Sequence, residues 1–510
     1  MNLGNIINEN TMARGIITMS FSNNNTSNII SQNLSLNILH LEEILHIKSA
    51  SDILVRNFNI GHSKAYWIGI NGLVSNDTLQ YIFSDLLDKA NTYDNVVEDI
   101  ESFMNTRITY GQAELCSDWD KILKHILSGP SVLFIDGFDQ AIVLDCRHYP
   151  GRSISEPDVE IVTKGAKDSF TESLTSNTGL IRRRIRSYDL IFDRISIGSE
   201  SKTDVSIGYI YGKSDLSLVS SIKEALTSAN ITSITMGSKS IEEILLRKRW
   251  CNPMPSMIST QRPDVIASYL TEGYICVVTD TSPYVLILPT TIFQYTQSPE
   301  DYYKTPAVGN YIRLIRFLSI VTALLLMPLF LLLGSLKNIL PEWLSYVTGT
   351  HMSCIRMFVY VLFVELGLDL FKYASAHSFS GYSNSLSIVG GLIIGDIATS
   401  LNWASTEILF YEALTLLATL ALPYVELGDA IRLYRLFLII TTGIGGCLGV
   451  GILGFTIGII MVIISIVTTP TFGDKSYFWP LHPFNKKALK TLLFRYTTPH
   501  AQPANTWNDL

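Results

Sequence analysis

Two long charge-free segments in the second half of the chain constrain its fold more than any other feature. Phe317–Leu336 and Leu436–Thr468 contain no Asp, Glu, Lys or Arg. A run of ~20 apolar residues lets a helix cross the ~30 Å hydrocarbon layer of a membrane. As one helix the longer segment would measure about 50 Å at ~1.5 Å per residue. Its centre is rich in glycine, so we expect a hairpin of two helices.

Three further apolar segments lie between these two. Thr406–Tyr424 is long enough to span, whereas Met357–Phe371 and Ser385–Thr399 are short and could instead form a re-entrant pair. The sequence therefore predicts about four to six membrane crossings. If the number is even, most flanking basic residues fall on one side, which is typical of the cytoplasmic side. Those residues are Arg313, Arg316, Lys372, Arg432, Arg435, Lys486, Lys487 and Lys490. Lys337 and Arg356 would fall on the opposite side.

Residues 37–300 alternate short apolar runs with polar helical patterns, which is typical of soluble α/β domains. The order strand, glycine turn, aspartate and amphipathic helix occurs at 65–87 and again at 205–226. A hairpin signal follows each of them, at 131–145 and 274–289. We therefore expect an α/β soluble N-terminal region, made of two small α/β lobes joined by a helical segment, followed by an all-α multi-span membrane domain.

The domain boundaries follow from changes in composition. We expect a disordered tail at 1–36, a first lobe at 37–150, a helical connector at 151–195, a second lobe at 196–305, a transmembrane domain at 306–473 and a basic amphipathic tail at 474–510. The first residues contain no apolar stretch of signal-peptide length, so the lobes are expected to stay cytoplasmic. A helix at 478–495 would lie on anionic lipid or dock on the N-terminal region.

Composition and motifs exclude several classes of protein. The net charge of −7 argues against nucleic-acid binding, which leaves a basic footprint. The six cysteines form no Cys-x-x-Cys pair and the nine histidines form no ligand cluster, so we expect no metal and no cofactor. Phosphate-binding, dinucleotide-binding and nucleophile-elbow motifs are missing from the sequence. We therefore expect a protein that is not an enzyme.

Carboxylates inside the apolar segments are the candidates for an ion path. They are Asp396, Glu365, Asp369 and Glu412. A charge in the middle of a bilayer costs ~2.5–3.5 kcal/mol on insertion scales, so such groups face a bundle interior or water. Glu365 and Asp369 are four residues apart and share one helical face. These carboxylates would line a pore, or they would lie at the depth of the membrane interface or in structural ion pairs. Further along the chain, Glu426, Asp429, Arg432 and Arg435 are expected in a loop between spans, where they would pair with one another.

The densest positive charge lies in the stretch "GLIRRRIR" at 179–186. The capping-box pattern Ser169-x-x-Glu172 and a stripe of apolar residues predict a helix over 170–186. Helical phase places Arg184 near the apolar stripe and Arg182, Arg183 and Arg186 on other faces. A buried or half-buried Arg184 would pair with Glu156, Glu160 or Glu172. We expect contacts between lobes or subunits; binding of lipid phosphate and of nucleic acid are the alternatives.

Several blocks of the sequence are similar to those of a known family. They are "GRSISEPDVE", "GAKDSFTESLTSNTGLIRRRIR", "KTDVSIGYI", "QRPD", "SPEDYY", "YIRLIRF", "SIVGGLIIGD" and "DAIRLYR". In this order they resemble the signature blocks of the bacterial spore germination GerA family, A-subunit type. The residues that match signature positions are Gly151, Arg152, Glu156, Pro157, Glu172, Asn177, Arg182, Arg183, Arg184, Arg186, Lys202, Thr203 and Asp204.

This resemblance implies a protein of the spore inner membrane with its soluble region on the core side. It also implies a homo-oligomer around a channel that releases monovalent cations when germinants bind, with other germination membrane proteins as partners. Two further functions are compatible with the sequence. One is a non-conducting scaffold for germinant receptors. The other is a carrier of a small solute of the dipicolinate type, since broken helices with midplane charges also occur in transporters.

Overall fold

The computed structural model describes residues 28–92, 99–108, 110–149, 165–246, 252–337, 339, 341, 353–376, 400, 405–473 and 476–494. These residues divide into two compact units. The first unit comprises Met1–Gly151 and Thr178–Asp193, and the second comprises Arg152–Asn177 and Arg194–Leu510. Each unit is described by itself.

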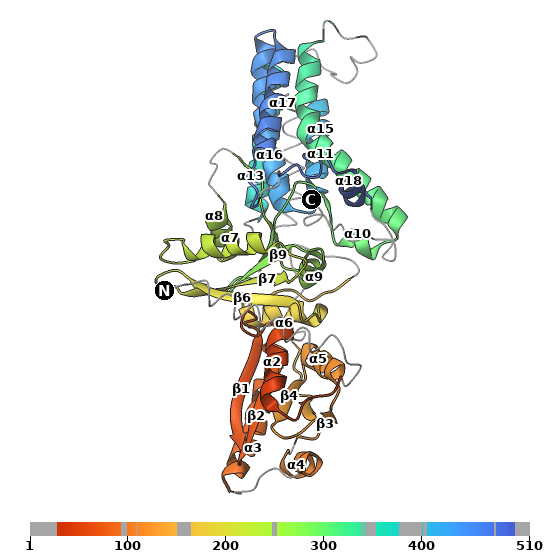
Figure 1. Ribbon diagram of the computed structural model, residues 1–510. Helices are drawn as coiled ribbons and strands as arrows, with labels where there is room; N and C mark the ends of the chain where they lie inside the picture. The colour runs from red at the N-terminus through yellow and green to blue at the C-terminus, as the bar shows by residue number, and fades with distance from the viewer. Residues whose placement is uncertain are drawn as a thin grey trace, which may run out of the picture. The chain divides into compact units, whose positions relative to one another are not determined.

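The first unit contains a five-stranded sheet with the strand order β1-β2-β4-β5-β3 (Figure 1). Its strands are β1 (Ile53–Ile60), β2 (Ser63–Ile70), β3 (Ala113–Cys116), β4 (Ser131–Ile135) and β5 (Ala141–Leu144), and its helices are α2 (Leu34–Ile44), α3 (Asn76–Thr92), α4 (Ile100–Arg107) and α5 (Trp119–Ser128). Every pair of neighbouring strands is antiparallel. The fully buried strands β4 and β5 form the centre of the core.

A second sheet has the same strand order, β6-β7-β9-β10-β8. Its strands are β6 (Leu190–Ile197), β7 (Thr203–Ile210), β8 (Ile258–Thr260), β9 (Ile275–Thr279) and β10 (Val285–Leu288), and the helices of this repeat are α6 (Leu174–Arg184), α7 (Leu216–Thr227), α8 (Ser238–Leu245) and α9 (Pro263–Thr271). Helices and strands therefore follow each other in the same order twice. The expectation of two α/β lobes joined by a helical segment is confirmed.

The repeat extends to polar contacts at the start of each lobe. In the first lobe the amide of Asn37 accepts a hydrogen bond from Ser31 N at 3.0 Å and donates one to Ser31 O at 2.6 Å. In the second, Asn177 makes the same two bonds with Thr171, at 2.8 and 2.5 Å. In both lobes the asparagine is the fourth residue of the helix. Its side chain bonds to the backbone of the residue six positions earlier, which lies before the helix. We call this contact the asparagine clamp.

In each lobe an aspartate that is distant in the sequence also bonds to the first residue of this helix. Asp136, which follows β4, accepts a hydrogen bond from Leu34 N at 3.0 Å. Asp280, which follows β9, accepts one from Leu174 N at 3.1 Å. Free N–H groups of a helical first turn favour such acidic partners. Asp136, at the turn between β4 and β5, therefore caps the start of a helix.

These contacts also explain why α6 is shorter than predicted. The helix begins at Leu174, whereas the sequence predicted residue 170. Ser169 does not cap it, because its hydroxyl donates to Gln261 O at 3.2 Å. Phe170 N also donates to Gln261 O, at 2.8 Å. The chain before Leu174 is held in a non-helical conformation by these bonds and by the clamp at Asn177.

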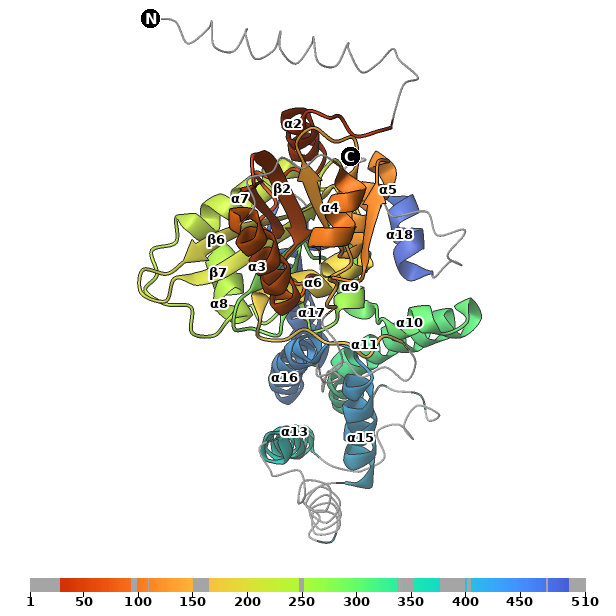
Figure 2. The ribbon, with the colours of Figure 1, turned by 90° about the horizontal axis from the view of Figure 1, so that it is seen from below.

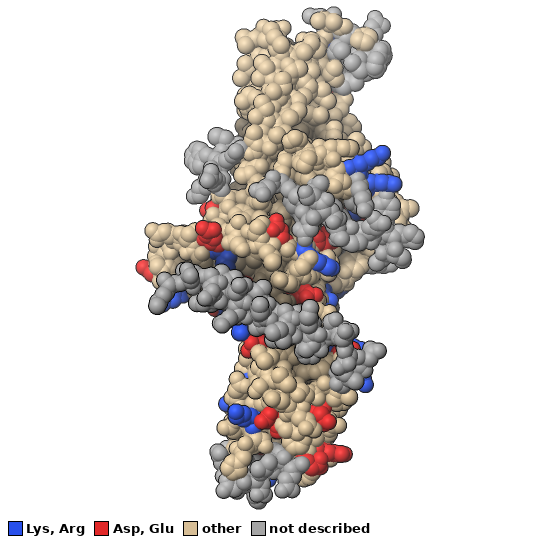
Figure 3. All heavy atoms as spheres, in the orientation of Figure 1, with Lys and Arg blue, Asp and Glu red and all other residues tan. Residues whose placement is uncertain are grey.

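The rest of the second unit is helical (Figures 1 and 2). Its helices are α10 (Glu300–Tyr303), α11 (Pro306–Ser335), α13 (Cys354–Ala376), α15 (Thr406–Leu420), α16 (Val425–Cys447), α17 (Gly451–Val467) and α18 (Lys486–Leu493). Among the described residues, α11 and α16 are long and apolar enough to cross a membrane, and α17 is a shorter apolar helix. In Figure 3 the surface over α16 and α17 is almost without charged side chains.

The predicted hairpin is confirmed by α16 and α17, which meet at Gly449 with a φ of 80°. Their packing depends on small residues. A Cβ at Gly445 would lie 2.9 Å from Gly454 Cα, and one at Gly458 would lie 2.5 Å from Thr441 Oγ1. Glycines let the two backbones approach closely, as in many membrane helix pairs.

Contacts between the other helices fix their directions. The rings of Phe330 in α11 and Tyr411 in α15 lie 5.1 Å apart, while α11 and α16 meet near their C-terminal ends, where a Cβ at Gly446 would lie 3.1 Å from Ser335 Cβ. Together with the contacts around Arg435 described below, these positions make α11 parallel to α16 and antiparallel to α15.

The helical part is attached to the second lobe by buried polar contacts. Arg316 Nη1 of α11 donates to Thr296 O, which follows the last strand of the second lobe, at 2.6 Å. Asp301 of α10 is 0 % exposed and accepts from Arg316 Nη1 at 3.0 Å and from Arg313 Nε at 3.2 Å. Asn252 Nδ2 donates to Ser465 O at 3.0 Å, at the C-terminal end of α17. Arg313 Nη1 also donates to Leu492 O of α18 at 3.1 Å, so the C-terminal helix is docked at the same place.

A glycine in α6 gives the first testable prediction. Alanine at position 179 would favour the helix by up to ~1 kcal/mol through propensity alone. Its Cβ would, however, lie 2.9 Å from the backbone oxygen of Gly72. Overpacking of this kind costs ~1–3 kcal/mol. We expect Gly179→Ala to lower the midpoint of thermal unfolding, measured with the full-length protein in detergent.

The matched control is Gly111→Ala, since a Cβ at Gly111 meets nothing within 4 Å. This variant should unfold at the wild-type temperature. A Gly179→Ala protein that is more stable than wild type would contradict the close approach of residues 72 and 179.

Candidate functional site

The helical part contains a buried guanidinium that contacts three other helices. Arg435 in α16 donates from Nε to Glu365 Oε1 of α13 at 2.9 Å. Its Nη1 donates to Ala323 O of α11 at 3.1 Å and to Thr419 Oγ1 of α15 at 3.4 Å. Arg435 is 4 % exposed and Glu365 is 1 % exposed. Four helices therefore meet at one charged group.

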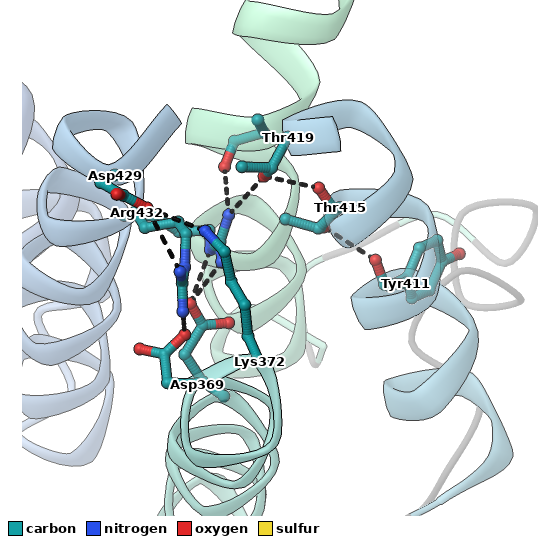
Figure 4. A network of polar contacts seen from close by, with 10 residues as sticks. Asp369, Lys372, Tyr411, Thr415, Thr419, Asp429 and Arg432 are labelled. Atoms are coloured by element: carbon teal, nitrogen blue, oxygen red, sulfur yellow. Dashed lines mark hydrogen bonds and ion pairs between the residues drawn. The ribbon is translucent and has the colours of Figure 1, made fainter. Parts of the chain in front are cut away.

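A second carboxyl group lies beside this pair. Glu412 in α15 is 1 % exposed and neighbours Glu365. Among the described residues, Oε1 of Glu412 and Oε2 of Glu365 have no hydrogen-bond partner. The hydroxyls on the same helix are already used, since Thr415 donates to Tyr411 O and Thr419 to Thr415 O (Figure 4). We call Glu365, Glu412 and Arg435 the carboxyl–arginine cluster.

Ion pairs closer to the second lobe extend the cluster toward solvent. Asp369 pairs with Arg432, and Lys372 Nζ donates to Asp429 Oδ1 at 2.8 Å (Figure 4). Arg432 also lies 3.5 Å from Asp429. Lys372 and Asp429 are partly exposed, with side-chain exposures of 37 % and 53 %. Burial therefore increases from this end toward the carboxyl–arginine cluster.

All these pairs lie on one antiparallel seam between α13 and α16. The paired positions are 358 with 443, 365 with 435, 369 with 432 and 372 with 429. Each step forward along α13 is matched by an equal step backward along α16, to within one residue, as expected for antiparallel helices in one register. The first position is the tightest, because a Cβ on Gly443 would lie 2.1 Å from Phe358 Cδ2. A side chain at 443 would push the two helices apart.

The predicted ion-path residues thus have different environments. Glu365 and Asp369 lie on one face of α13, and each has an arginine partner. Glu412 lies in the same cluster, whereas Asp396 lies outside the described residues. Within these residues no group of three His, Cys, Asp or Glu side chains could hold a metal ion.

Sequence reasoning missed the partner of Glu365. It placed residues 426–435 in a loop between spans, whose charges would pair with one another, but these residues form the first turns of α16. Arg432 does contact Asp429, while Arg435 reaches across to α13. The missed signal is the helical spacing of Asp429, Arg432 and Arg435, which continues into the buried stripe of Leu438 and Thr442.

The arginine-rich stretch is organised around Arg182. This side chain is 1 % exposed, and its Nε donates to Asp52 Oδ2 at 2.8 Å. Its two terminal nitrogens donate to Ser187 O at 3.0 Å and to Leu190 O at 2.9 Å. Arg184 is half-buried, which agrees with the sequence expectation. The expectation that Arg182 is free to reach a neighbouring lobe or subunit is wrong, because this side chain is buried against Asp52. Helical phase could not single out Arg182, because its partner Asp52 lies 130 residues away in the sequence.

The remaining residues of this candidate site are closer to solvent. The guanidinium carbon of Arg183 lies 4.8 Å from the ring centroid of Tyr149, and Arg186 Nη1 lies 3.4 Å from Ser128 Oγ. Glu172 is exposed, and its backbone oxygen accepts from Thr281 N at 2.7 Å. Glu156 lies outside the described residues.

Comparison with known proteins assigns the chain to a family. It matches the Bacillus/Clostridium GerA spore germination protein family over residues 40–505 and belongs to that family. Stage V sporulation protein AF of Bacillus subtilis (strain 168) is 32 % identical over 88 % of this chain and 90 % of its own length. Spore germination protein KA of the same organism is 30 % identical over 92 % of this chain and 85 % of its own.

The sequence-based resemblance to the GerA family is thereby confirmed. Within the family, the blocks "KTPAVGNYIRLIRF" and "FWPLHPFNKKALKTLLFR" resemble the stage V sporulation protein AF type. Among solved structures, the N-terminal domain of the A subunit of the Bacillus megaterium spore germinant receptor GerK3 matches 51 % of this chain and 96 % of its own. The sequence identity is 27 % and the TM-score is 0.38.

The carboxyl–arginine cluster gives the second prediction. Arg435→Met leaves Glu365 buried without its cation, and breaking such a pair costs ~3–5 kcal/mol. We expect a large fall in the unfolding midpoint in detergent. The double variant Glu365→Leu/Arg435→Met should recover most of it, because apolar replacement of a buried pair is close to neutral.

The control for this prediction is Lys372→Met at the exposed end of the same seam. A surface pair of this kind contributes ~0–1 kcal/mol. Equal destabilisation by Lys372→Met and Arg435→Met would mean that the burial of the cluster does not determine its strength.

The arginine-rich stretch gives the third prediction. Arg182→Met leaves the carboxylate of Asp52 buried, at 4 % exposure, without its cation. The free energy of unfolding should fall by ~3–5 kcal/mol. Arg183→Met removes only a contact with an aromatic ring, which contributes ~0.5–1 kcal/mol at exposed sites. Thermal unfolding of both variants measures the difference. The assignment of Arg182 as the structural arginine fails if the two variants unfold at the same temperature.

Proposed function

We propose that this chain is a subunit of an oligomeric ion-release channel in the spore inner membrane, with its two lobes on the cytoplasmic, core side. The carboxyl–arginine cluster is the observation that carries this proposal. One guanidinium cannot neutralise two ionised carboxylates, and an uncompensated buried charge is costly. The cluster therefore has room for one further positive charge, a proton or a monovalent cation.

The directions of the helices support a membrane domain with an even number of crossings. The α11 and α16 helices leave the second lobe, whereas α13, α15 and α17 run back toward it. Because α13 and α15 run in the same direction, six crossings require one return between residues 376 and 406. The predicted span Ser385–Thr399, with Asp396, falls in that interval of the sequence.

The outer surfaces of the helices support a lipid environment and subunit contacts. Apolar side chains that are at least half exposed recur along α17: Ile452, Leu453, Ile457, Ile460, Met461, Ile463 and Ile464. Exposed apolar area of this extent marks a membrane or protein interface. A homo-oligomer would bring several copies of Glu412 and Asp396 around a common axis.

A non-conducting scaffold that binds germinant receptors is the second candidate. The pairing of Glu365 and Asp369 with arginines favours it, because satisfied ion pairs can be purely structural. Relatives named as spore germination proteins support partners of the germination machinery for either function.

Ion flux from liposomes containing the full-length protein tests the channel, and is the fourth prediction. We expect passage of K⁺ or Na⁺, lost in Asp396→Ala. Glu412→Gln keeps the shape but removes the charge and should reduce the flux about tenfold, which corresponds to ~1.4 kcal/mol. The control is Glu407→Gln, in the first turn of the same helix and outside the cluster, which should conduct like wild type.

Three other results would contradict the channel or the role of Glu412 in it. Well-folded protein without flux supports the scaffold. Saturable uptake of one solute of the dipicolinate type supports a carrier. Equal flux in wild type and Glu412→Gln would remove Glu412 from the ion path.

A further inference from the structure

The end of the α13–α16 seam that lies away from the second lobe carries two cysteines. Cys354 is the first residue of α13 and Cys447 is the last residue of α16. A side-chain hydrogen bond joins their thiols. Both are free, with Cys447 exposed and Cys354 partly buried. This pair has no place in the proposed ion path.

The seam itself brings these two thiols together. Positions 354 and 447 continue the series of pairs at 358 and 443, 365 and 435, and 369 and 432. Cys354 lies 11 residues before Glu365, and Cys447 lies 12 residues after Arg435, so in each helix the thiol is ~16–18 Å along the axis from the carboxyl–arginine cluster. The ion pairs therefore fix the register that aligns the cysteines.

Glycines give the thiols room to meet. A Cβ on Gly446 would lie 2.9 Å from Cys354 Sγ, so the sulfur of Cys354 occupies the space that a side chain would fill. Gly443, one turn earlier, lets the ring of Phe358 approach the backbone of α16. Two cysteines held side by side at adjoining helix ends have the proximity that a disulfide requires.

We propose that Cys354 and Cys447 form a reversible disulfide that joins α13 to α16. With a low-molecular-weight disulfide as oxidant, the Cys447 thiolate attacks one of its sulfurs and releases one thiolate. The Cys354 thiolate then attacks Cys447 Sγ in the mixed disulfide, forms the internal bond and releases the second thiolate. Two protein thiols are oxidised and one disulfide is reduced, with two protons released.

The orientation of the chain decides which compartment reaches this site, and this part of the inference rests on the proposed function. With the lobes on the core side, the cysteine pair lies on the opposite side of the inner membrane. Disulfides form and persist in compartments outside the reducing cytosol. The chemistry of the pair itself does not depend on ion conduction.

The fifth prediction follows from this pair. Full-length protein in liposomes is treated with oxidised glutathione as the low-molecular-weight disulfide, the remaining thiols are blocked with N-ethylmaleimide, and the digest is analysed by mass spectrometry. We expect a peptide that links Cys354 to Cys447, lighter by two hydrogens than the reduced pair, which disappears after dithiothreitol. Buried Cys146 and Cys276 serve as internal controls and should stay unlinked.

Single variants show whether the partner is specific. In Cys354→Ser or Cys447→Ser the linked peptide should be lost and the remaining cysteine should be modified by maleimide instead. A membrane-impermeant maleimide should label Cys447 on the face opposite the lobes. The wild-type protein provides the decisive readout, so poor folding of a variant does not prevent the test.

Two results overturn the proposal. One is wild-type protein in which both cysteines remain alkylated after oxidation. The other is a linkage of either cysteine to a different residue or to a second subunit. Because the readout is a covalent bond, failure of the disulfide is distinct from failure of ion flux.

Discussion

The helical part of this protein depends on the side chain of Arg435. This guanidinium bonds to a carboxylate of α13, a backbone oxygen of α11 and a hydroxyl of α15, while its own helix packs closely on α17. Apolar packing between helices specifies direction and register only weakly, whereas a buried ion pair is satisfied in very few arrangements. Its contribution is therefore to select one arrangement of the helices.

The soluble region shows how a fold can be repeated with little repeated sequence. Both lobes use the same strand order, the same asparagine clamp and the same aspartate at the helix start. Alternating apolar runs and turn residues were enough to predict two lobes. The capping aspartates were not predictable, because Asp136 and Asp280 lie 102 and 106 residues from the amides they bind.

The same division holds for the candidate site. Glu365, Asp369 and Glu412 could be selected from the sequence because a carboxylate in an apolar segment is unusual. Their partners could not, because Arg435 and Arg432 were assigned to a loop instead of a helix. The burial of Arg182 could not be predicted either, because its partner Asp52 lies 130 residues earlier in the chain.

The antiparallel seam limits how α13 and α16 can move. Sliding one helix past the other by a single turn, about 5.4 Å, would break every ion pair at once and bring charged side chains against apolar ones. The ring of Phe358 would also lose the space beside Gly443 that it occupies. The two helices therefore behave as one rigid piece, and any rearrangement of the helical part would have to leave this seam intact.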